Sequence, residues 1–263
     1  MITGASSGIG AAMAHRLAQW GCDLLLTARR GERLEALAGD LRTAHGVQAD
    51  WIALDLTQPQ SAEALYRAAY ANHADVDILI NNAGFGEYQT FHATSWQRNA
   101  AMIQLNVVAL AELTHRFLQV MAPRSQRSYI LNTSSIIAFM PMPFFVNYGA
   151  TKAYVQVFTE SLAAELKGTN VSVTSLCSGG TNTEFSQAAG QKLDGVVAAG
   201  LMDPDRVAAI GLLAMLRRKR HVVPGVTNRI LCFCTRFLPR GTAGALAPVL
   251  LGKPAAPGPS RAD

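Results

Sequence analysis

The sequence has no hydrophobic segment long enough to span a membrane. A spanning helix needs about 18 to 20 consecutive apolar residues. The longest apolar run, IIAFMPMPFFV at 136–146, is shorter and is interrupted by Pro141 and Pro143. A glycine-rich segment begins at Thr3, so we also expect no secretory signal peptide. These features predict a cytoplasmic protein.

Cysteine is scarce, and the four cysteines form no pattern typical of a metal site. The chain has no C-x-x-C pair, and the C-x-C pair of Cys232 and Cys234 has no cluster of histidines near it. We therefore expect no bound metal, and we interpret the thiols as reduced and mostly apolar, as in a cytosolic protein.

Charged residues are also few. They make up 16% of the 263 residues, against 49% hydrophobic residues, which fits one α/β domain with a large core. The net charge of +5 favours an anionic ligand but does not indicate nucleic acid. The basic run RRKRH at 217–221 has no interleaved aromatic residues, so we interpret it as a solvated helix end.

Short apolar runs alternate with helical patterns along the chain. The candidate strands cover residues 23–28, 50–55, 77–82, 129–135, 171–177 and 221–225. Near-continuous apolar strands that alternate with helices are typical of a parallel sheet covered on both faces. The sequence therefore predicts a Rossmann-type α/β fold with a doubly wound parallel sheet in a single domain at 1–240. A C-terminal extension at 241–263, rich in Pro, Gly and Ala, is predicted to be partly disordered.

Two helices have clear start signals. Apolar residues recur every three or four positions between Thr94 and Pro123, and Thr94 with Gln97 matches a capping box. Pro123 is expected to end this helix. A second helix is predicted to start with Asp203 as its N-cap and Pro204 at its first position.

The segment TGASSGIG has glycines at Gly4, Gly8 and Gly10, followed by a predicted helix at 9–20. Such glycines allow a tight turn and let backbone N–H groups approach a pyrophosphate at a helix N-terminus. The spacing differs from the more familiar G-x-G-x-x-G, and glycines in any tight turn are the alternative interpretation.

Two arginines stand where NAD-specific folds place a carboxylate. About 20 residues after the glycine turn, that carboxylate binds the adenosine ribose hydroxyls. Here the strand at 23–28 is followed by Arg29 and Arg30. Guanidinium groups pair with a 2′-phosphate, which a carboxylate would repel. This predicts NADP(H) as the cofactor, with two solvated arginines at a helix start as the alternative.

The segment YGATK places Tyr148 and Lys152 four residues apart, one above the other on a helix. Tyrosine has a reference pKa near 10, too high for a base at neutral pH. An ammonium at about 4.5 Å would stabilise the phenolate by roughly 3–4 kcal/mol at an effective dielectric of 20. We therefore expect Lys152 to lower the pKa of Tyr148 and to prepare it for acid–base chemistry.

Other polar motifs converge with this pair. Ser135 ends the strand at 129–135, NNAG at 81–84 ends another strand, and Asn106 interrupts the apolar face of the helix at 94–123. Ligands of open α/β sheets gather at the carboxyl ends of the strands. We expect all these motifs to meet at one edge of the sheet.

With these motifs in order, the sequence resembles the short-chain dehydrogenase/reductase family over residues 1 to about 230. The resemblance implies hydride transfer between a nicotinamide cofactor and a carbonyl or alcohol. It implies that Tyr148 protonates the carbonyl oxygen, that Ser135 hydrogen-bonds it, and that Lys152 binds the nicotinamide ribose. Asn106 would hold a water in a proton relay. The implied cofactor-binding residues are Gly4, Ser6, Ser7, Gly8, Ile9, Gly10, Arg29, Arg30, Asp55, Leu56, Asn82, Ala83, Gly84, Tyr148, Lys152, Gly179, Thr181 and Thr183.

The sequence departs from the family pattern in two places. Ser178 stands where a proline usually precedes Gly179, which we expect to loosen that turn. Only Met1 and Ile2 precede the glycine-rich segment, whereas strands average five or six residues. The first strand is therefore predicted to be truncated, and we expect the natural start to lie upstream of Met1.

The substrate is predicted from the aromatic and methionine residues near the site. These are Phe85, Phe139, Met140, Met142, Phe144 and Phe145. If they face the pocket, the substrate is an apolar or bulky ketone or aldehyde; the alternative is that they cover core or a subunit contact. The segment at 181–203 is predicted to be a lid over the substrate. A 3-oxoacyl reductase and a non-catalytic NADP-binding module remain alternative functions.

Partners are predicted mainly by resemblance. Family members usually pair through the helices around 95–122 and 148–167, which implies a homodimer or homotetramer. The segment TNRILCFCTRFLPR at 227–240 combines apolar residues with arginines. It matches an interfacial membrane helix, but we favour a helix packed beside the substrate pocket or a neighbouring subunit.

Overall fold

The computed structural model describes residues 1–72, 75–191 and 200–237. Within them, one sheet has the strand order β3-β2-β1-β4-β5-β6-β7, and every neighbouring pair is parallel. The strands are β1 (Ile2–Thr3), β2 (Leu24–Ala28), β3 (Ala49–Ala53), β4 (Ile78–Asn81), β5 (Ser128–Ser135), β6 (Val171–Ser178) and β7 (His221–Val222). The predicted single-domain Rossmann-type fold is confirmed.

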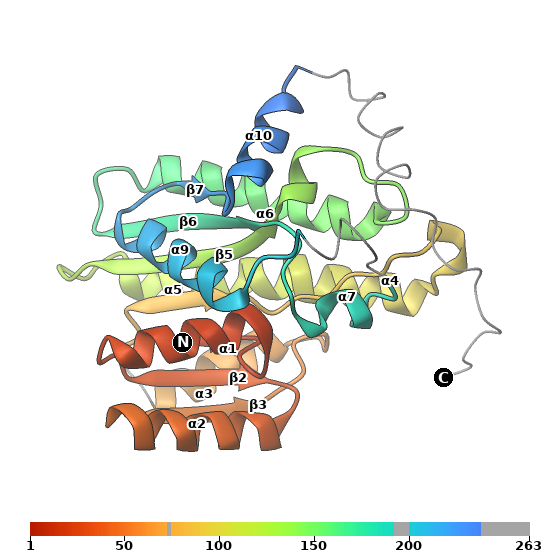
Figure 1. Ribbon diagram of the computed structural model, residues 1–263. Helices are drawn as coiled ribbons and strands as arrows, with labels where there is room; N and C mark the ends of the chain where they lie inside the picture. Colours follow the sequence, from red (N-terminus) through yellow and green to blue (C-terminus); the bar gives the residue numbers. More distant parts are fainter. Residues whose placement is uncertain (73–74, 192–199, 238–263) are drawn as a thin grey trace.

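Helices cover both faces of the sheet (Figure 1). One face carries α1 (Gly8–Gln19), α2 (Gly31–His45) and α9 (Pro204–Leu216). The other carries α3 (Ser61–Asn72), α5 (Leu110–Met121) and α6 (Val146–Glu165). The remaining helical segments are η1 (Phe91–Ala93), α4 (Trp96–Ile103), η2 (Gln104–Ala109), η3 (Ile136–Phe139), α7 (Glu184–Ala188) and α10 (Val226–Cys234). None of the helices in the described part of the chain combines the length and apolarity needed to cross a bilayer.

The central strand β1 is only two residues long, which confirms the predicted short first strand. Ile2 pairs with Leu26 of β2 on one side and with Ile80 of β4 on the other. Met1 extends the pairing with β4, because its carbonyl accepts from the Ile80 N–H at 2.9 Å and its ammonium donates to the Ile78 carbonyl at 2.7 Å. The short strand β1 is therefore still paired with β2 on one side and with β4 on the other.

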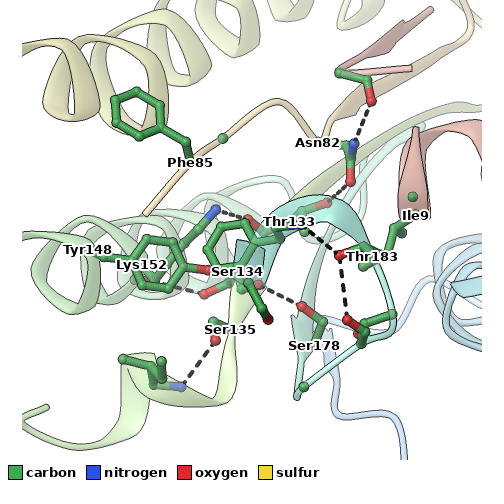
Figure 2. A pocket seen from close by; sticks show the side chains of 18 of the residues that line it. Ile9, Asn82, Phe85, Thr133, Ser134, Ser135, Tyr148, Lys152, Ser178 and Thr183 are labelled. Carbon is green, nitrogen blue, oxygen red and sulfur yellow. Dashed lines mark hydrogen bonds between the residues drawn. The ribbon is translucent and has the colours of Figure 1, made fainter. Parts of the chain in front are cut away.

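Because all strands are parallel, their carboxyl ends share one edge of the sheet. Asn82 follows β4, Ser135 ends β5 and Ser178 ends β6, and all three line the same pocket (Figure 2). The fold thus places segments that are far apart in the sequence around one site.

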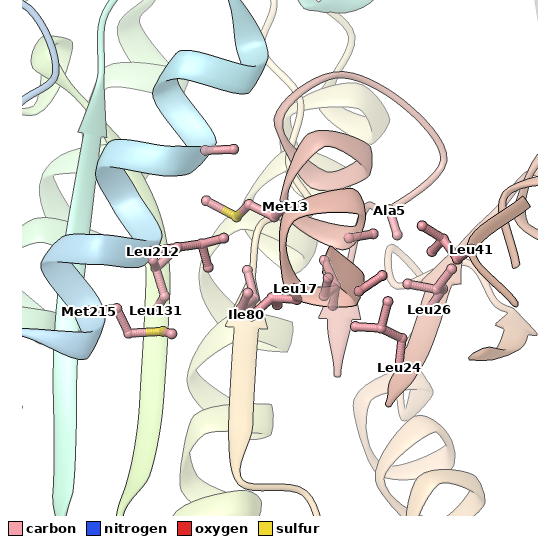
Figure 3. Packing of buried hydrophobic residues seen from close by; sticks show 14 of the residues in the cluster. Ala5, Met13, Leu17, Leu24, Leu26, Leu41, Ile80, Leu131, Leu212 and Met215 are labelled. Carbon is pink, nitrogen blue, oxygen red and sulfur yellow. The ribbon is translucent and has the colours of Figure 1, made fainter. Parts of the chain in front are cut away.

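The core on the α1 side is made of aliphatic residues from strands and helices (Figure 3). Met13 and Leu17 of α1 and Leu212 of α9 pack over Ile80 and the central strands, and all four side chains are buried. Met13 and Leu17 are four residues apart, so they lie on the same face of α1, which packs on the sheet. This packing holds α1, and with it the glycine-rich turn, against β1.

The structure corrects the prediction for residues 94–123. Ser95, not Thr94, is the N-cap, since its hydroxyl accepts from the Arg98 N–H at 3.2 Å. The Thr94 hydroxyl instead donates to the Thr90 carbonyl at 3.4 Å, so the predicted Thr94–Gln97 capping box is wrong. The single predicted helix is also divided, because residues 104–109 form one π-helical turn between α4 and α5.

Two other local predictions hold. The side chain of Asp203 accepts from the backbone N–H groups of Asp205 and Arg206, with Pro204 at the first position of α9. Residues 217–220 of the basic run are exposed directly after α9, and the exposed His221 is the first residue of β7. The predicted boundary at 240 and the extension at 241–263 lie outside the described residues.

Candidate active site

A cavity of about 790 Å³ opens at the carboxyl ends of the strands. Its lining includes almost every predicted site residue. These are Gly4, Ser6, Ser7, Gly8, Ile9, Arg29, Arg30, Asp55, Leu56, Asn82, Ala83, Gly84, Ser135, Tyr148, Lys152, Gly179, Thr181 and Thr183. The two exceptions, Gly10 and Asn106, lie directly behind the wall. The predicted convergence at one edge is therefore what the structure shows.

The glycine-rich turn has the geometry of an anion-binding cradle. Gly4 and Gly8 have φ values of 67° and 57°, which favour glycine. A Cβ on Gly10 would lie 2.3 Å from the Gly4 carbonyl oxygen, so only glycine permits the close approach of α1 to the turn. The N-cap Ser7 makes no side-chain capping bond, and the first N–H groups of a helix have no intrahelical partner. These donors could bind a pyrophosphate.

Asn82 braces this turn from the neighbouring strands. Its side-chain amide donates to the carbonyls of Thr3 (3.2 Å) and Gly4 (3.3 Å), and its Oδ1 accepts from the Thr133 hydroxyl at 3.3 Å. The Thr3 hydroxyl in turn accepts from the N–H groups of Asn82 and Ala83, both at 3.0 Å. The segment NNAG therefore joins β1, β4 and β5.

Tyr148, Lys152 and Ser135 lie near one another in the wall of the cavity (Figure 2). All three are buried, and Tyr148 and Lys152 share one face of α6. The Lys152 Nζ donates to the Thr133 carbonyl at 2.8 Å and lies 5.7 Å from the centroid of the Tyr148 ring. The Ser134 hydroxyl fixes α6 on β5 by donating to the Lys152 carbonyl at 2.9 Å.

Burial governs the titration of this pair. It raises the pKa of the Tyr148 phenol well above its usual value, and the hydrogen bond with Ser135 opposes that rise. It also lowers the pKa of Lys152 to about 8. The expectation that Tyr148 has a pKa near neutrality is therefore wrong for this arrangement, because desolvation of the phenolate is the largest cause of the shift.

Asn106 shapes the wall behind the cavity. Its side chain is completely buried in the π-helical turn. The amide nitrogen donates to the Phe85 carbonyl (2.9 Å) and to the Thr151 hydroxyl (3.1 Å), while Oδ1 accepts from the Phe85 N–H at 3.2 Å. Asn106 thus holds the segment after NNAG against α6. Its role in a water-mediated proton relay stays a prediction.

The end of the cavity near Arg29 and Arg30, where the adenosine of a nicotinamide cofactor would lie (the adenosine end), contains a charged cluster that the sequence analysis identified only in part. Arg30 donates to the hydroxyls of Ser6 and Ser7, at 3.1 and 2.8 Å, and forms an ion pair with Glu184 at 2.7 Å. Arg33 pairs with the same carboxylate at 2.6 Å. Asp55 also lines the cavity, and its carboxylate accepts from the backbone and hydroxyl of Thr57. The run RRGER at 29–33 could have indicated Arg33 as a further basic residue of this cluster. No local sequence pattern indicated that Glu184 would join it.

The segment after β6 crosses the cavity without the usual proline. The Ser178 hydroxyl donates to the Ser134 carbonyl at 3.4 Å, and the Thr181 hydroxyl donates to the Gly179 carbonyl at 3.0 Å. A Cβ on Gly179 would lie 2.4 Å from Nδ2 of Asn228, so α10 packs closely on this turn. Thr183 caps α7 by accepting from the Phe185 N–H. Residues 192–199 of the predicted lid lie outside the described part.

The apolar residues near the site divide between cavity and core. Phe85, Met140, Met142 and Phe145 line the cavity. Phe139 instead packs beside Cys177 and Cys232, and the Phe144 ring packs edge-on against Tyr88. Some of these apolar residues thus face the pocket, as one interpretation predicted, and the others pack in the core, as the alternative predicted.

Several residues at or beside the cavity were missed by the sequence analysis. A Cβ on Gly86 would lie 2.9 Å from the Phe185 ring and 3.1 Å from the Tyr148 ring, so this glycine admits both aromatics. The second glycine of NNAGFG was the available signal. From α10, Thr227, Asn228 and Leu231 line the cavity. The favoured placement of this helix beside the pocket is therefore confirmed for its described residues.

Comparison with known proteins identifies the family. A family model described as short chain dehydrogenase matches residues 1–194. The chain belongs to the short-chain dehydrogenase/reductase family. Like its relatives, this family member is an oxidoreductase of the class that acts on CH–OH or C=O groups.

Three relatives illustrate the range of this short-chain dehydrogenase/reductase group. The sulfoacetaldehyde reductase of Chromohalobacter salexigens is 39% identical over 70% of this chain and 73% of that protein. The 7beta-hydroxysteroid dehydrogenase of Collinsella aerofaciens is 31% identical over 70% of this chain and 68% of that protein. The solved short-chain dehydrogenase from Sphingobium yanoikuyae in complex with NADPH is 34% identical, covers 90% of this chain and 92% of its own, and has a TM-score of 0.78.

Proposed function

We propose that the protein is an NADP(H)-dependent reductase or dehydrogenase that interconverts a bulky apolar carbonyl compound and its alcohol. The observation that carries this proposal is the convergence of Tyr148, Ser135 and Lys152 with the glycine-rich turn in one cavity. A nicotinamide cofactor bound there would supply or accept the hydride. The remaining chemistry is proton transfer and binding by side chains of this chain.

Tyr148 is the proposed acid and base at the substrate oxygen. Its hydroxyl would give a proton to the carbonyl oxygen during reduction, and Ser135 would hydrogen-bond the same oxygen. Burial makes the Tyr148 phenol a weak acid, because its pKa is raised. When Lys152 is charged, its Nζ, 5.7 Å from the ring centroid, would favour the phenolate over the neutral phenol. Lys152 would therefore limit the cost of ionising Tyr148.

The choice of NADP(H) rests on the basic adenosine end. Arg29 and Arg30 line the cavity beside Ser6 and Ser7, where a 2′-phosphate would receive charge-assisted hydrogen bonds. The family relative from Sphingobium yanoikuyae, solved with NADPH, is consistent with this choice.

The choice of a bulky apolar substrate rests on the cavity wall near Tyr148. The residues there include Phe85, Ile137, Met142, Phe145, Phe185 and Leu231. Such a wall favours a large hydrophobic ligand held by a few polar groups. The similarity to a hydroxysteroid dehydrogenase supports the same class. The 3-oxoacyl alternative, the cytoplasmic location and the homo-oligomeric state stay predictions.

The experiment is a thermal-shift titration of the full 263-residue chain with NADPH and, separately, NADH. We expect the larger shift with NADPH. Arg29→Ala and Arg30→Ala should lose most of that difference, whereas Arg127→Ala, an exposed arginine outside the cavity lining, should keep it. A larger shift with NADH in the unmodified protein would contradict the proposed cofactor. Turnover of cyclic, bulky ketones above that of short aldehydes would support the substrate class.

A further inference from the structure

Glu184 lies across the adenosine end of the cavity from the arginines that it pairs with. It is the first residue of α7, which follows β6, whereas Arg30 and Arg33 lie at the start of α2, which follows β2. Its two carboxylate oxygens bind separate guanidinium groups, at 2.7 Å from Arg30 Nη1 and 2.6 Å from Arg33 Nη1. Glu184 also lines the cavity. One carboxylate thus ties the segment after β6 to the segment after β2.

Arg30 is shared between this carboxylate and the glycine-rich turn. Through Nη2 it donates to Ser6 and Ser7, and through Nη1 it donates to Glu184. In contrast, no ion pair of Arg29 is found within the described residues. The donors that would meet a 2′-phosphate are therefore already partly engaged by a negative charge that belongs to the protein.

This carboxylate is ionised near neutral pH. Its hydrogen bonds with Arg33 and Arg30 lower the pKa of Glu184 to about 2. The side chain is 49% exposed, so the pair is screened by water and salt and is weak enough to exchange partners.

NADP(H) and NAD(H) differ in how their 2′ groups interact with the negative charge of Glu184. A 2′-phosphate carries close to two negative charges and competes with Glu184 for the same guanidinium groups. The 2′-hydroxyl of NAD(H) is neutral and can donate a hydrogen bond to a carboxylate. A carboxylate at position 184 therefore weakens the binding of NADP(H), which has the 2′-phosphate, and is compatible with the binding of NAD(H), which has the 2′-hydroxyl.

We infer that Glu184 is a specificity-determining residue that limits the preference for NADP(H) over NAD(H). The inference rests on the proposed NADP(H) function and deepens it. The charge balance of the adenosine end would then be set by α7, so that cofactor preference depends on the segment after β6 as well as on the arginines after β2.

The test compares dissociation constants for NADPH and NADH in the full chain and in Glu184→Gln. We expect the variant to bind NADPH about five-fold more tightly, the upper end of the effect of an exposed charge pair, and to bind NADH within two-fold of the unmodified protein. Raising the salt concentration from low to about 1 M should reduce the gain, because screening shortens the range of the charges. Glu184→Asp, which keeps the charge, should stay closer to the unmodified protein.

The matched control is Glu35→Gln, an exposed carboxylate on α2 outside the cavity lining, which changes the net charge equally. Equal gains in both variants would overturn the inference, because they would reflect overall charge alone. An unchanged or lower NADPH-to-NADH preference in Glu184→Gln would also overturn it. Failure of the unmodified protein to bind either cofactor would instead overturn the proposed function, and the inference with it.

Discussion

The Nζ atom of Lys152 donates a hydrogen bond to the carbonyl oxygen of Thr133 at 2.8 Å. This bond joins the middle of α6 to the end of β5 and sets where the lysine charge lies in the cavity. Tyr148 and Lys152 are both buried beside this bond, and burial raises the pKa of Tyr148 and lowers that of Lys152. The chemistry of the site therefore depends on how α6 docks on the sheet.

Replacement of Tyr148 by phenylalanine should abolish turnover and retain cofactor binding. The change removes only the hydroxyl that would transfer the proton, so we expect turnover to fall by about 10²–10⁴-fold. Steady-state rates and the NADPH dissociation constant measure the two effects. Tyr154→Phe, at a half-exposed position on the same helix, is the control and should keep normal rates. No turnover in either Tyr148→Phe or the unmodified protein would favour the alternative of a non-catalytic module, and equal, measurable turnover in both would contradict the proposed role of Tyr148.

The stability difference between the unmodified protein and Lys152→Met should depend on pH. Burial lowers the pKa of Lys152 in the folded state to about 8, below the reference value of 10.5 for the unfolded chain. Between these values the unfolded state binds more protons, so the unmodified protein gains stability relative to the variant as the pH rises. The full change should be on the order of 3 kcal/mol.

Chemical denaturation at pH 7.5, 9 and 10.5 measures this difference. Titration of the buried cysteines and of Tyr148 occurs in both proteins and largely cancels in the comparison. A difference that stays constant or shrinks with rising pH would show that Lys152 is not desolvated in the folded protein.

Gly10→Ala should destabilise the protein and prevent cofactor binding. The new methyl group would lie 2.3 Å from the backbone oxygen of Gly4, so the turn must move, at a cost of about 3 kcal/mol or more. Thermal denaturation and cofactor titration provide the measurements. Gly39→Ala is the matched control on α2, because nothing lies within 4 Å of its Cβ position. That variant should be stabilised by about 0.5–1 kcal/mol through improved helix propensity. Similar destabilisation in both variants would contradict the close approach at Gly10.

Asn106→Ala should lower the free energy of unfolding and disorder the cavity wall. The change leaves both backbone groups of Phe85 without their side-chain partner, which should cost about 2 kcal/mol. We also expect weaker cofactor binding, since Gly84 packs beside Asn106. The exposed Asn170, whose amide donates to the Arg124 carbonyl, provides the control, and Asn170→Ala should cost less than about 1 kcal/mol. An unaltered melting temperature for Asn106→Ala would argue against its bracing role.

Much of the fold followed from local pattern. Six strand predictions matched observed strands within a few residues, because near-continuous apolar runs between helical segments leave few alternatives to a buried parallel sheet. The start of α9 at Asp203 and Pro204 was predictable for the same reason, since capping is a contact between adjacent residues. The start at Ser95 was missed because Thr94 and Ser95 offer competing caps one residue apart.

Within the candidate site, the sequence was sufficient for features that depend on spacing along one element. Tyr148 and Lys152 share a face of α6 because they are four residues apart, and the glycines of the first turn permit conformations that other residues disfavour. The edge where the motifs meet also followed from pattern, because parallel strands place their carboxyl ends together.

Only the tertiary structure showed the contacts between distant segments and their electrostatic effects. The pairing of Glu184 with Arg30 spans 154 positions of the chain, and the bond from Lys152 to Thr133 depends on how α6 lies on β5. The direction of the Tyr148 pKa shift was likewise decided by burial, which is set by everything packed around the ring. Local sequence specifies which conformations each segment can adopt. The distances and solvent exclusion that set the chemistry arise only when those segments pack together.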